Sequence, residues 1–522
     1  MRRPLCTVLA WSMLMANLLE AQERKPQSSE SGVLSTGGDG TIISLLQQSH
    51  DLDQQLPVSL RLKFLSQQAH MISQLRTDLG REWANELFTL SFQTKGDQRS
   101  FVQNTAMDVL IRLDPDRALE LLHSLNMEEP EGKWASISPP KMQLVRRVFE
   151  VLVARDGASA LPLLEQEAEV LGVQWHYPYF ALGYAAMQAT SKDWGNDNQH
   201  AIQVLESVFE PAFARYSRTA HGYVEDFEFG RMLQVLAGGL PLNSVQPALH
   251  MLVKNLLATD IRKHQLQAEV RTSDGKSAKV DNAIDATILI LGSLINRDPE
   301  LAQQLESTRP ELRTALQYTK AGRQSSLKFG PSLPQNIYST NGDAETQMDA
   351  LRLAHINPEA AIAKAEQLQD EDKRASAMLE VARAIAGDYP ERAAELIAET
   401  QSRNKPIDDQ MQMNVISAQV FVAAAQNKKN ELHELLQRGF ESANHLLSGE
   451  QRTDGIPFTA DLEPLVQVGI QNDPDLTISF IASLSPPSLK AALLLQAATA
   501  LSLGRRLPFS TRPQQSVDRL DQ

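Results

Sequence analysis

The sequence is poor in cysteine, in aromatic residues and in positive charge. One of its 522 residues is cysteine, 6% are aromatic, and the formal net charge is -14. The single thiol, Cys6, lies in the N-terminal segment 1–21. A chain without that segment therefore has no thiol for a disulfide, a thiolate metal site or a cysteine nucleophile. The negative charge repels phosphate backbones, which argues against general nucleic-acid binding.

The scarcity of aromatic residues and of strict apolar–polar alternation argues against sandwiches and barrels. Apolar residues instead recur at three- and four-residue spacing, as in SFVQNTAMDVLIRL at 100–113. This spacing places the apolar side chains on one face of a helix. The predicted fold class is therefore all-α, and a chain of this length is expected to form two domains or one elongated repeat array.

The N-terminal segment 1–21 has the layout of a secretory signal peptide. Arg2 and Arg3 precede a mostly apolar run from Leu5 to Leu19, and the small residue Ala21 follows. The alternative is a membrane anchor, but the run is shorter than the roughly 20 residues that a spanning helix needs. Cleavage after Ala21 predicts an exported bacterial protein, periplasmic or extracellular, with no integral membrane segment after cleavage.

A short motif recurs along the chain. IRLDPDRALELLHSL at 111–125 and VARDGASALPLLEQE at 153–167 share an Asp followed by apolar residues at offsets +4, +5 and +8. Asp or Asn caps the first turn of a helix, and Pro fits the first helical position. The offsets lie on one face, so this face is predicted to be buried. Further copies begin at Asn357, Tyr389 and Asp473, whereas Asp298-Pro299 fits less well.

An apolar helix precedes most copies of the motif. The intervals from Asp114 to Asp156 and from Asn357 to Tyr389 are near those of helical-hairpin repeats. The stretch AHINPEAAIAKAEQL at 354–368 and the LDP and NPEA turns resemble repeats of the tetratricopeptide and HEAT type. The Trp, Gly and Tyr positions of the full tetratricopeptide pattern do not occur, so the resemblance concerns architecture alone. It implies an α-solenoid of helical hairpins in two blocks.

Composition divides the chain further. A Ser- and Gly-rich leader follows the signal segment, and a Pro-, Gly- and Ser-rich stretch separates two helical blocks. Lesser loops are expected at 126–139, 271–280 and 447–458. The predicted order is signal peptide 1–21, disordered leader 22–40, N-terminal helical block 41–318, linker 319–343, C-terminal helical block 344–505 and disordered tail 506–522.

Several catalytic signatures almost occur, and each lacks a required residue. HELLQ at 433–437 has Gln437 where a zincin needs its second histidine. DGKS at 274–277 lacks the first glycine of a phosphate loop, and GASAL at 157–161 is not a nucleophile elbow. The sequence therefore predicts no catalytic residue, no metal ligand and no cofactor.

Aromatic and acidic residues concentrate in two segments, 173–184 and 214–230. The candidate binding residues there are Trp175, His176, Tyr177, Tyr179, Tyr216, His221, Tyr223 and Asp226. One interpretation is a groove whose aromatic faces hold a peptide or a sugar. The other is a packing joint in which bulky side chains fill an irregular helix crossing and satisfy their polar atoms locally.

Three functional hypotheses remain open at this level. An exported α-solenoid typically holds another protein or peptide, and the net acidic charge would favour a basic partner segment. The first alternative is an enzyme of the α/α-toroid type that cleaves polysaccharide with paired carboxylates. The second is a structural component of the envelope.

The signal-peptide prediction has a direct test. Expressed in a bacterium, the full chain should be found in the periplasm or medium with Gln22 as its first residue, because signal peptidase cleaves after a small residue. Intact-mass analysis of the fractionated protein measures this, and a variant that lacks the segment 1–21 serves as the control. A full-length product retained in the cytosol would contradict the prediction.

Overall fold

The fold of the chain is given by a computed structural model. It describes residues 36–127, 140–219, 222–272, 277–313, 316, 325–329, 342–403, 409–448, 459–485 and 487–506. The described chain is predominantly helical, as the sequence predicts. The proposed signal segment, most of the leader and residues 507–522 lie outside the described residues. Residues 36–40, predicted to be part of a disordered leader, instead form the first turn of helix α2.

The chain divides into two compact units. Unit 1 comprises residues 1–76 and 338–522, and unit 2 comprises residues 77–337. This division differs from the predicted blocks, because the helices before residue 77 group with the C-terminal helices. Part of the predicted linker 319–343 is strand β3, and helix α17 begins at Gly342.

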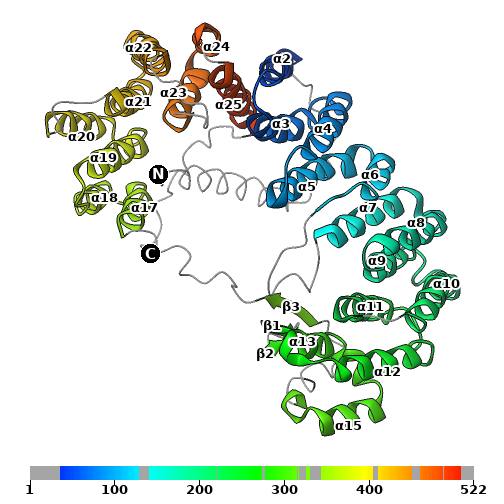
Figure 1. The fold of residues 1–522 in the computed structure, drawn as a ribbon. Helices are drawn as coiled ribbons and strands as arrows, with labels where there is room; N and C mark the ends of the chain where they lie inside the picture. The colour runs from blue at the N-terminus through cyan, green and yellow to red at the C-terminus, as the bar shows by residue number, and fades with distance from the viewer. Residues whose placement is uncertain are drawn as a thin grey trace, which may run out of the picture. The chain divides into compact units, whose positions relative to one another are not determined.

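Unit 2 is built mainly from helices that pack in succession. Its α-helices are α4 (Thr77–Ser91), α5 (Gly96–Leu113), α6 (Pro115–Leu122), α7 (Pro140–Asp156), α8 (Leu161–Gln174), α9 (Tyr179–Ala189), α10 (Asn198–Tyr216), α11 (Tyr223–Leu236), α12 (Leu242–Ala258), α13 (Ala283–Ile290), α14 (Gly292–Ile295) and α15 (Pro299–Thr308). Helices α5, α7, α9, α11 and α13 each pack on the next of this series (Figure 1). Helices α6, α8, α10 and α12 flank this row, and each contacts a member of it.

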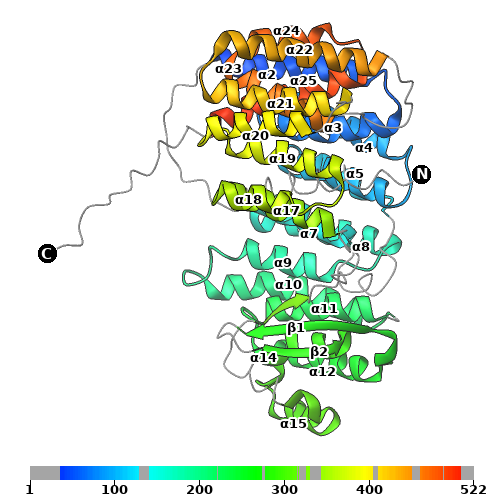
Figure 2. The same cartoon turned by 90° about the vertical axis from the view of Figure 1, so that its left-hand side faces the viewer.

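Unit 2 also contains a small sheet that the sequence analysis did not predict. Strands β1 (Gln265–Thr272), β2 (Ser277–Asn282) and β3 (Ser325–Phe329) form an antiparallel sheet in the order β2-β1-β3 (Figure 2). The expected loop at 271–280 is therefore wrong at both of its ends. Alternation in QAEV and SAKV on either side of Asp274-Gly275 is a hairpin signal, but each run is very short. The third strand is too far away in sequence for a local pattern to reveal it.

The capping role of the repeated Asp or Asn is confirmed for four helices. In each, the side-chain oxygen accepts a hydrogen bond from the backbone N–H three residues later, and Pro occupies the first helical position. The pairs are Asp114 with Arg117 at 3.2 Å, and Asp298 with Leu301, Asn357 with Ala360 and Asp473 with Leu476, each at 3.1 Å.

Two copies depart from the pattern. Asp156 does not cap, because Gly157 has φ of 64° and a short 3-10 helix, η1 (Gly157–Ala160), separates it from α8. A positive φ favours glycine, which explains why Gly replaces Pro in this copy. In the copy at Tyr389, Ala394 at offset +5 is exposed. The local pattern therefore fixes helix starts more reliably than it fixes the buried face.

Unit 1 joins the two ends of the chain. Its α-helices are α2 (Thr36–Asp53), α3 (Val58–Ile72), α17 (Gly342–Ala354), α18 (Pro358–Ala365), α19 (Glu371–Ile385), α20 (Pro390–Arg403), α21 (Asp409–Ala425), α22 (Lys429–Ser448), α23 (Thr459–Asn472), α24 (Pro474–Ser483) and α25 (Pro487–Arg506). Helices α17, α19, α21, α23 and α25 pack in succession, and α18, α20, α22 and α24 pair with the first four of them. Helices α2 and α3 then pack on α25, which covers the last apolar face of the series.

Buried polar contacts accompany the packing of α2 on α25. The Ser49 hydroxyl donates a hydrogen bond to the carbonyl oxygen of Ala491 at 2.7 Å and accepts one from Gln68 at 2.9 Å. The fully buried Asp53 carboxylate lies 3.7 Å from both His50 Nδ1 and Arg61 Nε. The Ser49–Ala491 hydrogen bond needs one register between α2 and α25, whereas the contacts of Gln68, His50, Arg61 and Asp53 hold α2 against α3.

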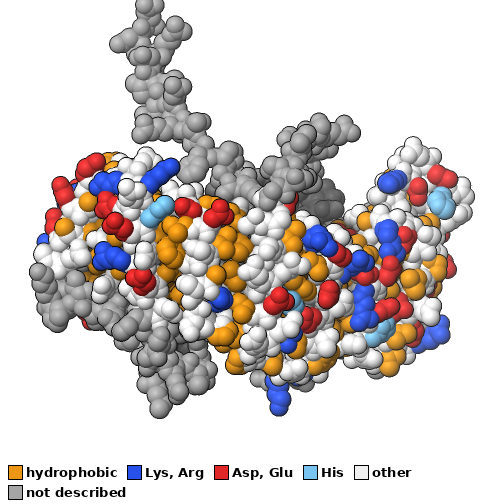
Figure 3. All heavy atoms as spheres, turned by 90° about the horizontal axis from the view of Figure 1, so that it is seen from above, with side chains coloured by type: hydrophobic (Ala, Val, Ile, Leu, Met, Phe, Trp, Pro, Cys, Tyr) orange, Lys and Arg blue, Asp and Glu red, His pale blue; other side chains and the backbone are white. Residues whose placement is uncertain are grey.

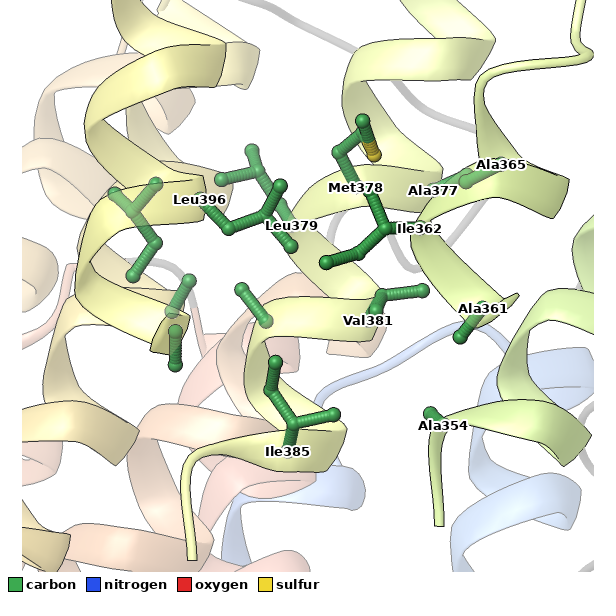
Figure 4. Close-up of a cluster of buried hydrophobic side chains, with 14 of the residues drawn as sticks. Ala354, Ala361, Ile362, Ala365, Ala377, Met378, Leu379, Val381, Ile385 and Leu396 are labelled. Carbon is green, nitrogen blue, oxygen red and sulfur yellow. The ribbon is translucent and has the colours of Figure 1, made fainter. Parts of the chain in front are cut away.

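The interior of unit 1 is assembled from alanine and branched aliphatic side chains. In Figure 4, Leu379 of α19 lies beside Leu396 of α20, while Val381 of α19 and Ile362 of α18 lie between α19 and α18. Each of the four is no more than 6% exposed. Alanines in the same cluster allow close approach of the helix backbones, which explains how a chain poor in aromatic residues fills its core.

The longest apolar run after the proposed signal segment, 286–295, forms α13 and α14, and most of its side chains are buried. Among the described residues, none of the helices has the length and apolar character to cross a membrane.

The caps allow a stability test within unit 2. Asp114→Ala should lower the free energy of unfolding by about 1 kcal/mol, because the first turn of α6 loses a hydrogen-bond acceptor. Asp114→Asn should retain most of the stability, since Asn caps equally well. Asp156→Ala is the matched control and should leave the free energy of unfolding almost unchanged. Urea unfolding followed by circular dichroism measures the three effects, and equal losses for Asp114→Ala and Asp156→Ala would contradict the capping role.

Candidate functional site

The predicted aromatic cluster lies where α9, α10 and α11 meet. Tyr179 and Tyr216 are fully buried, and Tyr177 and Tyr223 are at most 5% exposed. The rings of Tyr216 and Phe229 stack with their centroids 4.0 Å apart. Tyr179 meets Phe229 edge-on at 5.2 Å. Such ring pairs stabilise a core by about 1 kcal/mol beyond the area they bury.

The hydroxyl groups of Tyr216 and Tyr223 are satisfied inside the joint. The Tyr216 hydroxyl donates to Asp226 Oδ1 at 2.6 Å and accepts from Asn255 at 3.0 Å. The Tyr223 hydroxyl contacts the carbonyl oxygen of Ala283 and the Thr287 hydroxyl, both at 2.9 Å. Burial raises the pKa of Tyr216 and Tyr223, so both hydroxyls keep their protons and act as donors.

The other predicted residues are placed differently. Trp175 and His176 are half-buried between α8 and α9, and the Lys141 ammonium lies 5.5 Å from the centroid of the Trp175 ring. His221 lies outside the described residues. The packing-joint interpretation therefore accounts for the four tyrosines and Asp226, whose side chains are interior. Binding by the surface of this joint stays a prediction.

A catalytic interpretation of the aromatic segments would need a pair of exposed carboxylates, and Glu225 and Asp226 do not form one. Asp226 is 3% exposed and is engaged by Tyr216. Glu225 is half-buried, with its Oε1 3.5 Å from the Tyr179 hydroxyl. Within the described ranges, no group of three His, Cys, Asp or Glu side chains has the arrangement needed to hold a metal ion.

The accessible side of the joint carries a patch that the candidate list missed. It consists of Arg146 from α7, Phe180 and Tyr184 from α9, and Arg231 from α11, and we call it the arginine–aromatic patch. All four side chains are half-buried. The guanidinium carbon of Arg231 lies 4.1 Å from the centroid of the Phe180 ring, and that of Arg146 lies 5.8 Å from the same centroid. Arg146 also lies 5.6 Å from the centroid of Tyr184.

A buried carboxyl group lies beneath this patch. Glu228 is 3% exposed, and its carboxylate accepts a hydrogen bond from the backbone of Phe180. Burial raises the pKa of Glu228 to about 7, although Arg231 and Arg146 lower it in part. Burial likewise lowers the pKa of Arg231, and the nearby charge of Arg146 adds to that effect. Burial in a low-dielectric setting therefore disfavours the ionised forms of both Glu228 and Arg231.

The comparisons with known proteins add no relative. No protein-family model matches the chain, and neither the curated proteins nor the solved structures give a significant match. Evidence for the function of this chain therefore comes from its own geometry.

Sequence reasoning found the segment but not the patch, for a physical reason. Arg146 and Arg231 occupy positions in amphipathic helices where arginine is usually solvated. They are far apart in sequence, and only the packing of α7 and α11 on either side of α9 brings them to one ring. Phe180 belonged to the aromatic segment, but no local pattern distinguished it from the buried tyrosines.

The raised pKa of Glu228 predicts a pH-dependent stability. The folded chain holds the proton up to about pH 7, whereas an unfolded glutamate releases it near its usual value of 4.5. The unfolded state therefore binds fewer protons between these values, and the contribution of Glu228 to stability falls as the pH rises through this window.

Glu228→Gln should remove this dependence, because the amide does not ionise. The variant should gain on the order of 2 kcal/mol relative to wild type between pH 4.5 and pH 7. Denaturant unfolding at a series of pH values measures the difference. A stability difference between the two proteins that is constant over this range would refute the assignment.

Proposed function

We propose that this chain is an exported helical-repeat protein of the bacterial envelope that binds a protein or peptide, without catalysis. In this proposal the successive hairpins of each unit form an α-solenoid block. Stacked hairpins present one continuous row of helices, and such rows typically bind extended partners. The proposed export rests on the layout of the segment 1–21.

The arginine–aromatic patch is the observation that carries the proposal. Arginine and aromatic side chains are enriched at the centres of protein interfaces, because they combine large contact area with directional polar contacts. Here four such side chains lie together on α7, α9 and α11, which pack side by side in unit 2. The buried tyrosines beneath them hold α9 and α11 in place, so the patch is pre-organised for binding.

The polysaccharide-cleaving alternative has less support. It requires two carboxylates on either side of a substrate, with space between them. Asp226 is interior and hydrogen-bonded, and Glu228 is buried beneath Phe180. We therefore favour the binding proposal.

Site-directed photo-crosslinking tests the proposed function. Gln188 is exposed on α9, one helical turn beyond Tyr184, and a benzoylphenylalanine there should cross-link to a bound partner in envelope extracts. Ser207 is exposed on the neighbouring α10 and provides the matched control position. We expect an adduct of one defined mass with the probe at position 188 and none with the probe at 207. Equal adducts at both positions, or none at either, would contradict the proposal.

A further inference from the structure

Two positive charges share one aromatic ring in unit 2. The guanidinium groups of Arg146 and Arg231 both lie within 5.8 Å of the Phe180 centroid. The ring attracts each guanidinium, but two like charges at one ring in a half-buried setting also repel each other. An anion that contacted both guanidinium groups would gain from both charges.

Neither arginine is neutralised as its neighbours are. Three other arginines on α7 and α10 each form a salt bridge with a carboxylate: Arg147 with Asp108, Arg155 with Asp116 and Arg215 with Glu169. Within the described parts of the chain, Arg146 and Arg231 form no salt bridge. The arginine–aromatic patch is therefore locally positive, although the net charge of the whole chain is -14.

One hydrogen-bond donor of Arg231 also lacks an acceptor among the described residues. The Nε of Arg231 is buried and has no hydrogen-bond partner among the described residues. A buried donor without an acceptor costs free energy, so the Arg231 guanidinium is held beneath the surface at a cost. Glu228 compensates only in part, because its pKa of about 7 leaves part of it protonated at neutral pH.

We propose that the arginine–aromatic patch binds glutamate or aspartate side chains of an acidic segment in a protein partner. A carboxylate matches the planar fork of a guanidinium, and the aliphatic part of a glutamate packs on an aromatic face. This inference rests on the proposed function and specifies the chemistry of its partner.

The inference replaces the expectation of a basic partner segment at this patch. That expectation followed from the net charge of the whole chain. On the face shown in Figure 3, acidic, basic and hydrophobic side chains are interspersed, so the net charge does not describe each part of the surface. Charges farther away than about 10 Å are largely screened at physiological salt. The two arginines therefore determine which charge on a partner the patch attracts.

Fluorescence anisotropy with the full chain tests the inference. The probe is a fluorescein-labelled peptide of alternating glutamate and alanine, and the matched peptides carry glutamine or lysine in place of glutamate. We expect the glutamate peptide to bind most tightly and its affinity to fall as salt is added. Replacing Arg146 and Arg231 together by Gln should weaken binding by about a hundredfold, roughly tenfold for each charge-assisted contact.

Two further variants separate binding from folding. Arg147→Gln with Arg155→Gln removes the same net charge from α7 and should leave the affinity within about twofold. Arg231→Lys keeps the charge but loses the planar fork, and it should cause an intermediate loss even if Arg231→Gln does not fold. Circular dichroism melts establish that each variant is folded.

Several outcomes would overturn the inference. They are equal binding of the glutamate and glutamine peptides, tighter binding of the lysine peptide, no binding of any peptide, or equal losses in the two double variants. Competition by free glutarate as strong as that by the peptide would indicate a small-anion site instead. A Gln188 adduct that persists in the Arg146→Gln, Arg231→Gln variant would overturn the inference and leave the proposed function standing. Absence of any adduct would count against the proposed function itself.

Discussion

Burial of one apolar stripe per helix against the next hairpin is the constraint on which each unit depends. An amphipathic helix cannot satisfy this stripe alone, so every hairpin needs a neighbour and the last one needs a cover. In unit 1, α2 and α3 from the beginning of the chain cover α25 near its end. Ser49 of α2 then donates a hydrogen bond to the Ala491 carbonyl oxygen of α25, so the cover is specific as well as apolar.

The aromatic joint of unit 2 shows a different use of the same constraint. The chain has few aromatic residues and places several of them between α9, α10 and α11. Tyr216 fills volume with its ring and engages Asp226 and Asn255 with its hydroxyl. This interior fixes the positions of the helices that carry Phe180 and Arg231. The packing of the buried tyrosines therefore determines where the side chains of the candidate site lie at the surface.

Charge at this site is decided by burial more than by composition. The Glu228 carboxyl group lies beneath the arginine–aromatic patch, and burial disfavours its ionised form. Arginine side chains carry a permanent positive charge in proteins, so the imbalance persists. On α7, the charge of Arg155 is neutralised by a salt bridge with Asp116. Among the described residues, Arg146 on the same helix has no such salt bridge. A local positive site on an acidic chain follows from this difference.

The sequence by itself determined the helical class, the starts of several helices and the segment that holds the aromatic joint. These depend on interactions within a few residues: Asp114 caps its own helix, Pro115 fits the first turn, and apolar spacing sets one face. Tertiary structure alone decided the pairing of α2 with α25, the third strand of the sheet, and which aromatic side chains are interior. It also decided that Arg146 and Arg231 meet at Phe180. Each of these depends on residues far apart in the chain, and local patterns carry no information about which distant faces will pack together.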